Sequence, residues 1–313
     1  MDKKSGFQIV IKDCMDVKKE ETILILTDDK KLKIGQGLFE EAKKHAKEAV
    51  LMVMESRSVS GEEPPKCVAE SMKNFDVIIA PTSTSITHTH AKINAIKGGA
   101  RLASMPGITS EMFEVGAITA DYGEVEELTL KFTELLTNAE RAKLEKGGHV
   151  LTFDLKGRKG IPSTGVYRNK GEAGNLPSGE AYIAPLENGV NGTMIIDGSM
   201  VGIGKLDSPL KVEIIDGVLN SIEGDIENKL KVLFNTKENS TIAELGIGTN
   251  KSAKLTGVIL EDEKIYGTVH IAFGTNTSFG GNNKAGVHMD GIILNPTLYL
   301  DEKLVIDKGV VKI

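Results

Sequence analysis

The sequence lacks long apolar runs, and it lacks an excess of positive charge. Its 313 residues carry a formal net charge of −6 at pH 7. No stretch approaches the roughly 18 consecutive apolar residues that a membrane helix needs. A nucleic-acid-binding face requires concentrated lysine and arginine, which the interspersed charges of this chain do not provide. We therefore expect a protein that binds neither nucleic acid nor membranes.

Two further features are missing near the start of the chain and among the cysteines. The first residues, MDKKSGFQIVIKDC, contain no uninterrupted apolar segment followed by a small-residue cleavage site. The two cysteines, Cys14 and Cys67, are far apart and have neither metal-binding nor redox spacing. We expect both to be reduced and structural. These absences predict a cytoplasmic protein.

The first half of the sequence alternates between strand and helix patterns. Residues 21–27, 50–55 and 75–82 are typical of strands, whereas residues 33–49 and about 122–146 have the apolar spacing of helices. This alternation predicts a parallel sheet covered by helices. No GxGxxG motif follows the first strand, so a dinucleotide site is not predicted.

Short β-type runs separated by Gly, Asn and Asp turns begin near residue 148. The Asp-Gly pairs at 197–198 and 216–217 are typical of hairpins. We predict an N-terminal αβα domain with a parallel sheet over residues 1–147. A mainly antiparallel, β-rich domain is predicted over residues 148–313. The chain is long enough for each domain to have its own core.

Polar residues that can bind a metal lie on several of these β segments. In VHMDGII, His288 and Asp290 share one face because side chains alternate along a strand. His270 in YGTVHIAFG and Glu244 in TIAELGIG each lie opposite an apolar face. Glu180 begins a strand in LPSGEAYIAP. The sequence therefore places five potential ligands on consecutive strands of the β-rich domain.

Each of these residues alone has a common structural explanation, but the set is suited to a divalent metal. Imidazole with carboxylate is the ligand mixture of zinc, cobalt, manganese or ferrous iron. Three carboxylates can neutralise two dications. We predict a site for one or two ions in the β-rich domain. The loop TNTSFGGNNKAG between the two histidines is expected to form a mobile rim because of its glycines and asparagines.

A polar turn, PTSTSITHTH, follows the third predicted strand and contains His88 and His90. Either Thr87 or Thr89 caps the following helix, or the N-terminus of that helix receives an anionic group of a substrate. The sequence leaves both interpretations open.

The motifs GEAYIAP, AELGIGTN, HIAFGTN and HMDGII, in this order, resemble those of metallo-aminopeptidases of the aminopeptidase T and aminopeptidase S type. The segment PTSTSITHTHAKINAIKGGARLASMPGIT is similar to the shorter leucyl-aminopeptidase-like members. The resemblance implies a homodimeric, dinuclear zinc, cobalt or manganese hydrolase that removes N-terminal amino acids from peptides. Matched by motif, Glu180 or Glu244 would activate the water. The implied metal ligands are Glu180, Glu244, His270, His288 and Asp290.

The sequence departs from that pattern after the HIAFG motif, where these aminopeptidases carry a tyrosine. The corresponding stretch here contains Phe279 and no tyrosine. The resemblance also extends to 2,5-dihydroxypyridine 5,6-dioxygenase, a ferrous enzyme, and His270, His288 and Asp290 alone form a 2-His-1-carboxylate set. We predict an aminopeptidase. The alternatives are a non-haem Fe(II) ring-cleaving dioxygenase and a metal-binding relative without peptidase activity.

Overall fold

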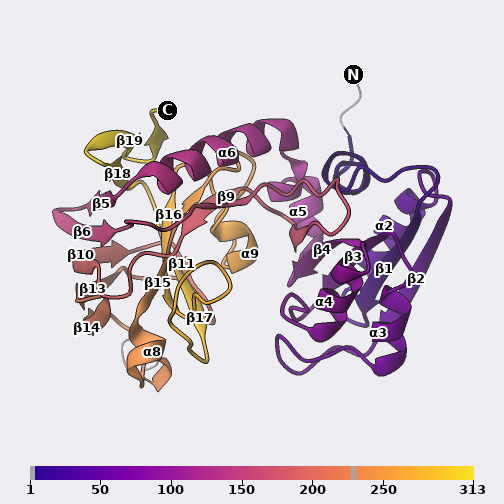
Figure 1. Cartoon of the computed structure of the whole chain (residues 1–313), viewed down its shortest axis with the longest axis horizontal. Helices are drawn as coiled ribbons and strands as arrows, with labels where there is room; N and C mark the ends of the chain where they lie inside the picture. Colours follow the sequence, from indigo (N-terminus) through magenta and orange to yellow (C-terminus); the bar gives the residue numbers. More distant parts are fainter. Residues whose placement is uncertain (1–3, 227–229, 231) are drawn as a thin grey trace. The chain divides into compact units, whose positions relative to one another are not determined.

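The computed structural model describes residues 4–226, 230 and 232–313, and it divides into two compact units (Figure 1). Unit 1 comprises Met1–Glu126 and Gly165–Ser178, and unit 2 comprises Glu127–Thr164 and Gly179–Ile313. This division differs from the single boundary at 147/148 that the sequence pattern predicts. The chain enters unit 2, returns to unit 1 and then enters unit 2 again.

Unit 1 contains a five-stranded sheet in the order β2-β1-β3-β4-β8, and all its strand pairs are parallel. Its middle strands are buried along nearly their whole length, as expected for a sheet with both faces covered. The strands are β1 (Thr22–Asp28), β2 (Glu48–Met54), β3 (Val77–Thr82), β4 (Arg101–Pro106) and β8 (Ala173–Asn175).

The helices of unit 1 cover both faces of this sheet. Side chains from α3 and α4 pack against Leu24 and Ile78 on one face. Gly35 of α2 lies against Thr27, whose side chain points to the other face, and a Cβ at Gly35 would be 2.7 Å from Thr27 Cγ2. The bounds are α1 (Gly6–Gln8), η1 (Ile9–Cys14), α2 (Leu32–Ala42), α3 (Lys66–Met72), α4 (His90–Lys97), α5 (Ser110–Glu114) and η2 (Ala117–Thr119).

The turn that contains His88 and His90 ends in a capped helix. Thr89 is the N-cap of α4, and its hydroxyl accepts a hydrogen bond from the Lys92 N–H. The carboxylate of Glu63 accepts hydrogen bonds from the first two N–H groups of this helix, those of His90 (2.5 Å) and Ala91 (3.1 Å). The capping interpretation is confirmed, and the anion at this helix N-terminus is a side chain of the protein itself.

Two predicted helices are shorter in the structure, because strands occupy their C-terminal parts. The helix predicted over 33–49 ends at Ala42, and β2 begins at Glu48 and pairs with β1. The helix predicted over 122–146 is α6 (Tyr122–Asn138), which is followed by β5. In both cases cross-strand pairing overrides a helical sequence pattern.

Unit 2 contains two antiparallel sheets, as the β-rich pattern predicts. The eight-stranded sheet has the order β14-β13-β10-β6-β5-β18-β19-β20, and the seven-stranded sheet has the order β12-β11-β17-β16-β15-β9-β7. The first sheet is formed by β5 (Arg141–Lys146), β6 (His149–Asp154), β10 (Val190–Ile196), β13 (Leu210–Ile215), β14 (Val218–Glu223), β18 (Thr297–Leu300), β19 (Lys303–Asp307) and β20 (Val310–Val311). The second is formed by β7 (Ile161–Ser163), β9 (Glu180–Ile183), β11 (Ser199–Met200), β12 (Gly204–Lys205), β15 (Ile242–Gly248), β16 (Val269–Gly274) and β17 (His288–Ile293).

One continuous apolar core joins the two sheets of unit 2. It includes Leu144 and Phe153 from the first sheet and Leu245 and Ile271 from the second, together with Phe132 of α6. The burial of α6 residues in this core explains why the division between units falls inside that helix. Two short helices, α8 (Lys237–Ser240) and α9 (Ile259–Asp262), precede β15 and β16. Within the described residues, no helix combines the length and apolar character needed to cross a membrane.

Candidate metal centre

The five predicted ligands lie on β9, β15, β16 and β17, which are neighbours in the seven-stranded sheet. Strand neighbours of these residues, such as Ala181, Leu245, Ile271 and Met289, belong to the core between the sheets. Because side chains alternate along strands, the five polar residues are on the opposite face of the sheet. The five side chains therefore lie on the sheet face that points away from the core, as the sequence predicts.

The five side chains form two groups that share Glu244. Glu180, Glu244 and His270 form one group, which we call the inner cluster. Glu244, His288 and Asp290 form the other, the outer cluster. Within each group, one ligand atom from every residue lies within 4.8 Å of the others. The structure thus brings all five residues together, and their roles as ligands or catalytic groups stay predictions.

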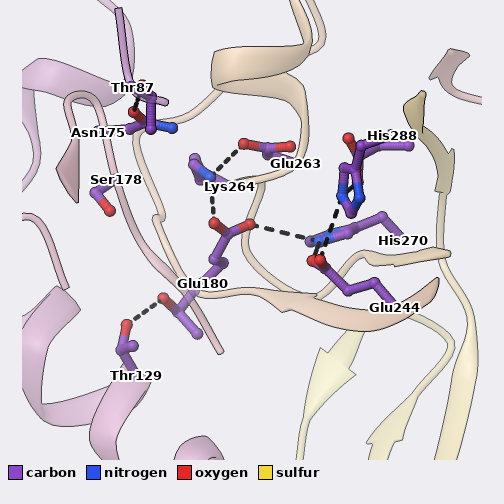
Figure 2. Close-up of polar contacts among 12 residues, drawn as sticks. Thr87, Thr129, Asn175, Ser178, Glu180, Glu244, Glu263, Lys264, His270 and His288 are labelled. Carbon is purple, nitrogen blue, oxygen red and sulfur yellow. Dashed lines mark hydrogen bonds and ion pairs between the residues drawn. The ribbon is translucent and has the colours of Figure 1, made fainter. Parts of the chain in front are cut away.

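Glu244 is central because its two carboxylate oxygens face different histidines (Figure 2). Its Oε1 is 3.2 Å from His270 Nε2, and its Oε2 is 3.4 Å from His288 Nε2. His270 Nε2 is also 3.4 Å from Glu180 Oε2, and His288 Nε2 is 3.6 Å from Asp290 Oδ1. The trio of His270, His288 and Asp290, proposed from sequence as an iron triad, is divided between the clusters.

A local irregularity in β15 lies directly before Glu244. The register with β16 shifts between Ile242 and Glu244, and Ile242 instead of Ala243 joins the core. A β-bulge of this kind changes the direction of a side chain next to a functional site. Simple alternation from Leu245 therefore predicts the face of Glu244 correctly, but it does not continue past the irregularity to Ile242.

Gly246 allows the His270 ring to extend across β15. Gly246 is opposite His270 in the strand register, and a Cβ at Gly246 would be 1.9 Å from His270 Nε2. No side chain larger than hydrogen fits there without displacing the ring. The glycine of the AELGIG motif is thus a positioning residue that the sequence alone did not reveal.

A buried lysine that the sequence patterns did not indicate lies beside the inner cluster. Lys264, located between α9 and β16, is 0% exposed, and its Nζ is 2.5 Å from Glu180 Oε1. It also forms an ion pair with Glu263 (Figure 2). A lysine in the charged run EDEKIYG is normally expected at the surface. A possible signal was the position of this run, directly before the strand that carries His270.

Burial and charge shift the pKa values of the site residues in opposite directions. Burial alone would lower the pKa of His270, but the hydrogen bond to Glu244 and the charges of Glu180, Glu244 and Asp290 raise it to about 9. Burial would raise the pKa of Glu244, yet hydrogen bonds from both histidines lower it to about 2. Burial also opposes the charge of His288, and Asp290 outweighs it, so the pKa of His288 is raised.

Burial likewise affects the two residues beside the inner cluster. It raises the pKa of Glu263 to about 8, although the Lys264 charge acts in the opposite direction. Burial would lower the pKa of Lys264, but Glu180 and Glu263 raise it. The Lys264 ammonium group is therefore charged in its buried position.

The loop between the two histidines is held by a hydrogen bond to Glu187 and by hydrogen bonds within the loop. Glu187 Oε1 accepts a hydrogen bond from the Asn282 N–H at 2.6 Å, and Asn276 Oδ1 accepts one from the Asn283 N–H at 2.8 Å. Phe279 makes edge contacts with His288 and Tyr182, at ring-centroid distances of 5.9 and 5.3 Å. The predicted rim thus brings an aromatic side chain to the outer cluster.

The donor atoms fit a divalent metal ion. Metal–ligand bonds of about 2.0–2.2 Å place neighbouring ligand atoms roughly 3–3.5 Å apart, close to the 3.2–3.6 Å separations around Glu244. The imidazole and carboxylate donors suit a dication. His288 Nδ1 lies 2.9 Å from the Thr275 carbonyl oxygen, to which it can donate while Nε2 faces the ligand carboxylates. This arrangement is typical of metal-binding histidines.

The sequence model of the 2,5-dihydroxypyridine 5,6-dioxygenase family matches residues 4–313. The chain belongs to this family. A relative named 2,5-dihydroxypyridine 5,6-dioxygenase, from Pseudomonas putida, is 28% identical over 170 residues. That alignment covers 48% of this chain and 47% of the relative, so it spans about half of the relative's length.

Two solved structures have the same fold as this dioxygenase-family chain. The 2,5-dihydroxypyridine dioxygenase structure from Pseudomonas putida matches with a TM-score of 0.81, 19% identity, and coverage of 98% of this chain and 96% of that chain. Wild-type AmpT from Thermus thermophilus matches with a TM-score of 0.73, 14% identity, and 98% coverage of each chain. At these identities the likeness concerns the fold.

The predicted assignment to the aminopeptidases, with hydrolase and protease activity, is wrong. The family match assigns the chain to a dioxygenase family instead. The expected fold is confirmed, since the AmpT structure shares it. Ligand motifs on a shared fold identified a candidate metal-binding face, but they did not determine the reaction at that face.

Proposed function

We propose that this chain is a non-haem Fe(II) dioxygenase that opens a dihydroxylated aromatic ring of the 2,5-dihydroxypyridine type. The match of the family model to residues 4–313 carries this proposal. The imidazole and carboxylate side chains of the two clusters support it, because they are suitable ligands for ferrous iron. Zinc, cobalt and manganese were predicted as the ions of a peptidase, whereas the ion proposed for the dioxygenase is ferrous iron.

In this proposal, Glu244, His288 and Asp290 hold the ion. These residues form the outer cluster, where Glu244 and Asp290 are buried and 31% of the His288 side-chain surface is exposed. The exposed side gives dioxygen and substrate a route to the cluster. Bound ferrous iron supplies the redox chemistry that allows dioxygen to react with an aromatic ring.

Residues of this chain would orient the substrate beside that ion. The ring of Phe279 lies next to His288 and also contacts the ring of Tyr182, and a planar substrate can pack against these aromatic surfaces. Glu180 Oε2 is buried and has no hydrogen-bond partner among the described residues. It is positioned to accept the proton of a substrate hydroxyl, whereas Lys264 holds the other oxygen of the same carboxylate.

An oxygen-uptake assay tests the proposed function. The protein is purified anaerobically, loaded with Fe(II) and mixed with 2,5-dihydroxypyridine in aerated buffer. We expect one dioxygen to be consumed per substrate, with loss of the aromatic absorbance and no requirement for an added reductant. Removal of iron with a chelator should abolish uptake, and added Fe(II) should restore it. Iron-loaded protein that leaves both dioxygen and the substrate unchanged would contradict the proposal. The predicted homodimer and cytoplasmic location stay predictions.

A further inference from the structure

We infer that Lys264 takes the place of a second metal ion in the inner cluster, so that the chain binds one ion, in the outer cluster. The inference rests on the proposed metal-dependent function and concerns the number of ions. It arises because the structure offers two three-residue ligand groups, and either could hold a dication on the basis of ligand type alone.

The contacts of Lys264 place a fixed positive charge at the inner cluster. Its Nζ donates to Glu180 Oε1 at 2.5 Å and is also hydrogen-bonded to Glu263 (Figure 2). The side chain is fully buried, so water does not screen its charge. A dication bound to Glu180 would share that carboxylate with the ammonium group and would be repelled by it.

The outer cluster has no comparable cation. In residues 4–226, 230 and 232–313, no lysine or arginine forms an ion pair with the carboxylates of Glu244 or Asp290, which pair only with histidines. A dication there is attracted by the carboxylates of Glu244 and Asp290 without competition from an ammonium group. Charge therefore favours the outer cluster over the inner one.

The second nitrogens of the two histidines support the same assignment. His288 Nδ1 is 2.9 Å from the Thr275 carbonyl oxygen, which fixes the ring with Nε2 toward Glu244 and Asp290. His270 Nδ1 is buried, and no hydrogen-bond partner for it exists among the described residues. A metal-ligating histidine almost always donates its other N–H to an acceptor. Only His288 meets that requirement.

A buried carboxylate oxygen of Glu180 is available to bind a second ion if Lys264 is removed. Glu180 Oε2 has no hydrogen-bond partner in the described part of the chain and is 3.4 Å from His270 Nε2. With the lysine charge removed, Glu180, Glu244 and His270 would form an unopposed three-ligand site. The inference therefore predicts that loss of the Lys264 charge creates a second metal site.

The experiment counts ions in the full-length protein. Wild type and Lys264→Met are equilibrated with excess Mn(II), passed through a desalting column and analysed for manganese per chain. Electron paramagnetic resonance then distinguishes isolated from spin-coupled ions. We expect one ion in the wild type and a second, coupled ion in Lys264→Met. The matched control is Lys211→Met, which removes a lysine paired with Glu223 at the surface and should retain one ion.

Methionine leaves Glu180 and Glu263 without a cation, so the single variant is at risk of misfolding. The double variant Lys264→Met/Glu263→Gln also replaces the Glu263 carboxyl group, so that this buried acid is not left without its lysine partner. It should fold and also bind the second ion. Circular dichroism and a thermal melt verify folding before ions are counted.

The possible outcomes separate this inference from the proposed function. Two ions in the wild type, or one ion in a folded variant without Lys264, would overturn the role of Lys264 and leave metal-dependent oxygenation intact. A wild type that binds no Mn(II) or Fe(II) would overturn the proposed function and the inference together.

Discussion

The inner and outer clusters use the same kinds of ligand on the same sheet face, but their surroundings differ. Glu180, Glu244 and His270 are all buried, and a lysine ammonium group touches the first of them. The outer cluster reaches the surface through His288 and has an aromatic side chain beside it. Ligand identity alone is therefore not enough to predict how many ions bind, because adjacent charges and access also contribute.

The largest expected effect concerns the outer cluster. His288→Ala removes a proposed ligand, and we expect Fe(II) affinity to fall on the order of 100-fold or more, with loss of dioxygen uptake. His149→Ala is the matched control, since His149 is on the other sheet of unit 2 and is hydrogen-bonded to Thr193. Metal content and binding affinity are measured directly. Unchanged iron content in His288→Ala would remove His288 from the proposed ligands.

The next prediction concerns the packing of the His270 ring in the inner cluster. Gly246→Ala places a Cβ against His270 Nε2 and must displace the ring. Overpacking of this kind costs about 1–3 kcal/mol of stability. We also expect cleavage of the substrate's aromatic ring to slow about tenfold or more, because Glu244 loses its hydrogen-bond partner His270. Gly286→Ala is the control, as the nearest atom to its Cβ is 4.0 Å away. Equal activity and melting temperature for both variants would contradict the proposed packing role.

A smaller effect is expected at the aromatic edge of the outer cluster. Phe279→Leu keeps an apolar side chain but removes the ring beside His288. Loss of an aromatic contact of about 0.5–1.5 kcal/mol corresponds to a KM increase of roughly two- to tenfold. Iron content should be unchanged. Phe39→Leu, at the α2 ring that Lys43 contacts, serves as control. A change in kcat with unaltered KM would argue against substrate packing on Phe279.

The smallest predicted effect is the response of the metal-free protein to pH. Because the folded-state pKa of His270 is raised to about 9, protonated His270 stabilises the fold below pH 6.5, and this contribution is lost as pH rises through about 9. We expect the melting temperature of chelator-treated protein to fall by a few degrees between pH 6.5 and 9. His270→Gln should show a smaller fall. An equal fall in both proteins would assign the effect to other groups.

Sequence patterns predicted most of the fold and the ligand face, for identifiable reasons. Period-two alternation in HIAFG and HMDGII placed His270, His288 and Asp290 on one side of a sheet whose other side is core. The same reasoning could not predict that β8 joins the parallel sheet of unit 1, because its pairing with β4 depends on contacts distant in sequence. The predicted C-terminal end of α6 was wrong for the same reason, since Arg141–Lys146 forms a strand that pairs with two other strands.

The features missed at the site are those that sequence patterns describe poorly. Lys264 was not recognised as part of the site, because lysine is rarely buried without partners and one of its partners, Glu180, is distant in sequence. The division of the five ligands into two groups reflects the contact of Glu244 with both histidines, and the His270 ring needs the space left by Gly246. The reaction was misassigned because enzymes with different names share the fold.

The return of Gly165–Ser178 to unit 1 has a consequence for synthesis on the ribosome. Until β8 (Ala173–Asn175) has emerged, one side of β4 has no strand partner in the parallel sheet. An unpaired sheet edge can join another chain and aggregate. By the time β8 is made, β5 and β6 of unit 2 have already been translated. The N-terminal sheet therefore receives its last strand only after the first strands of the second unit have been translated.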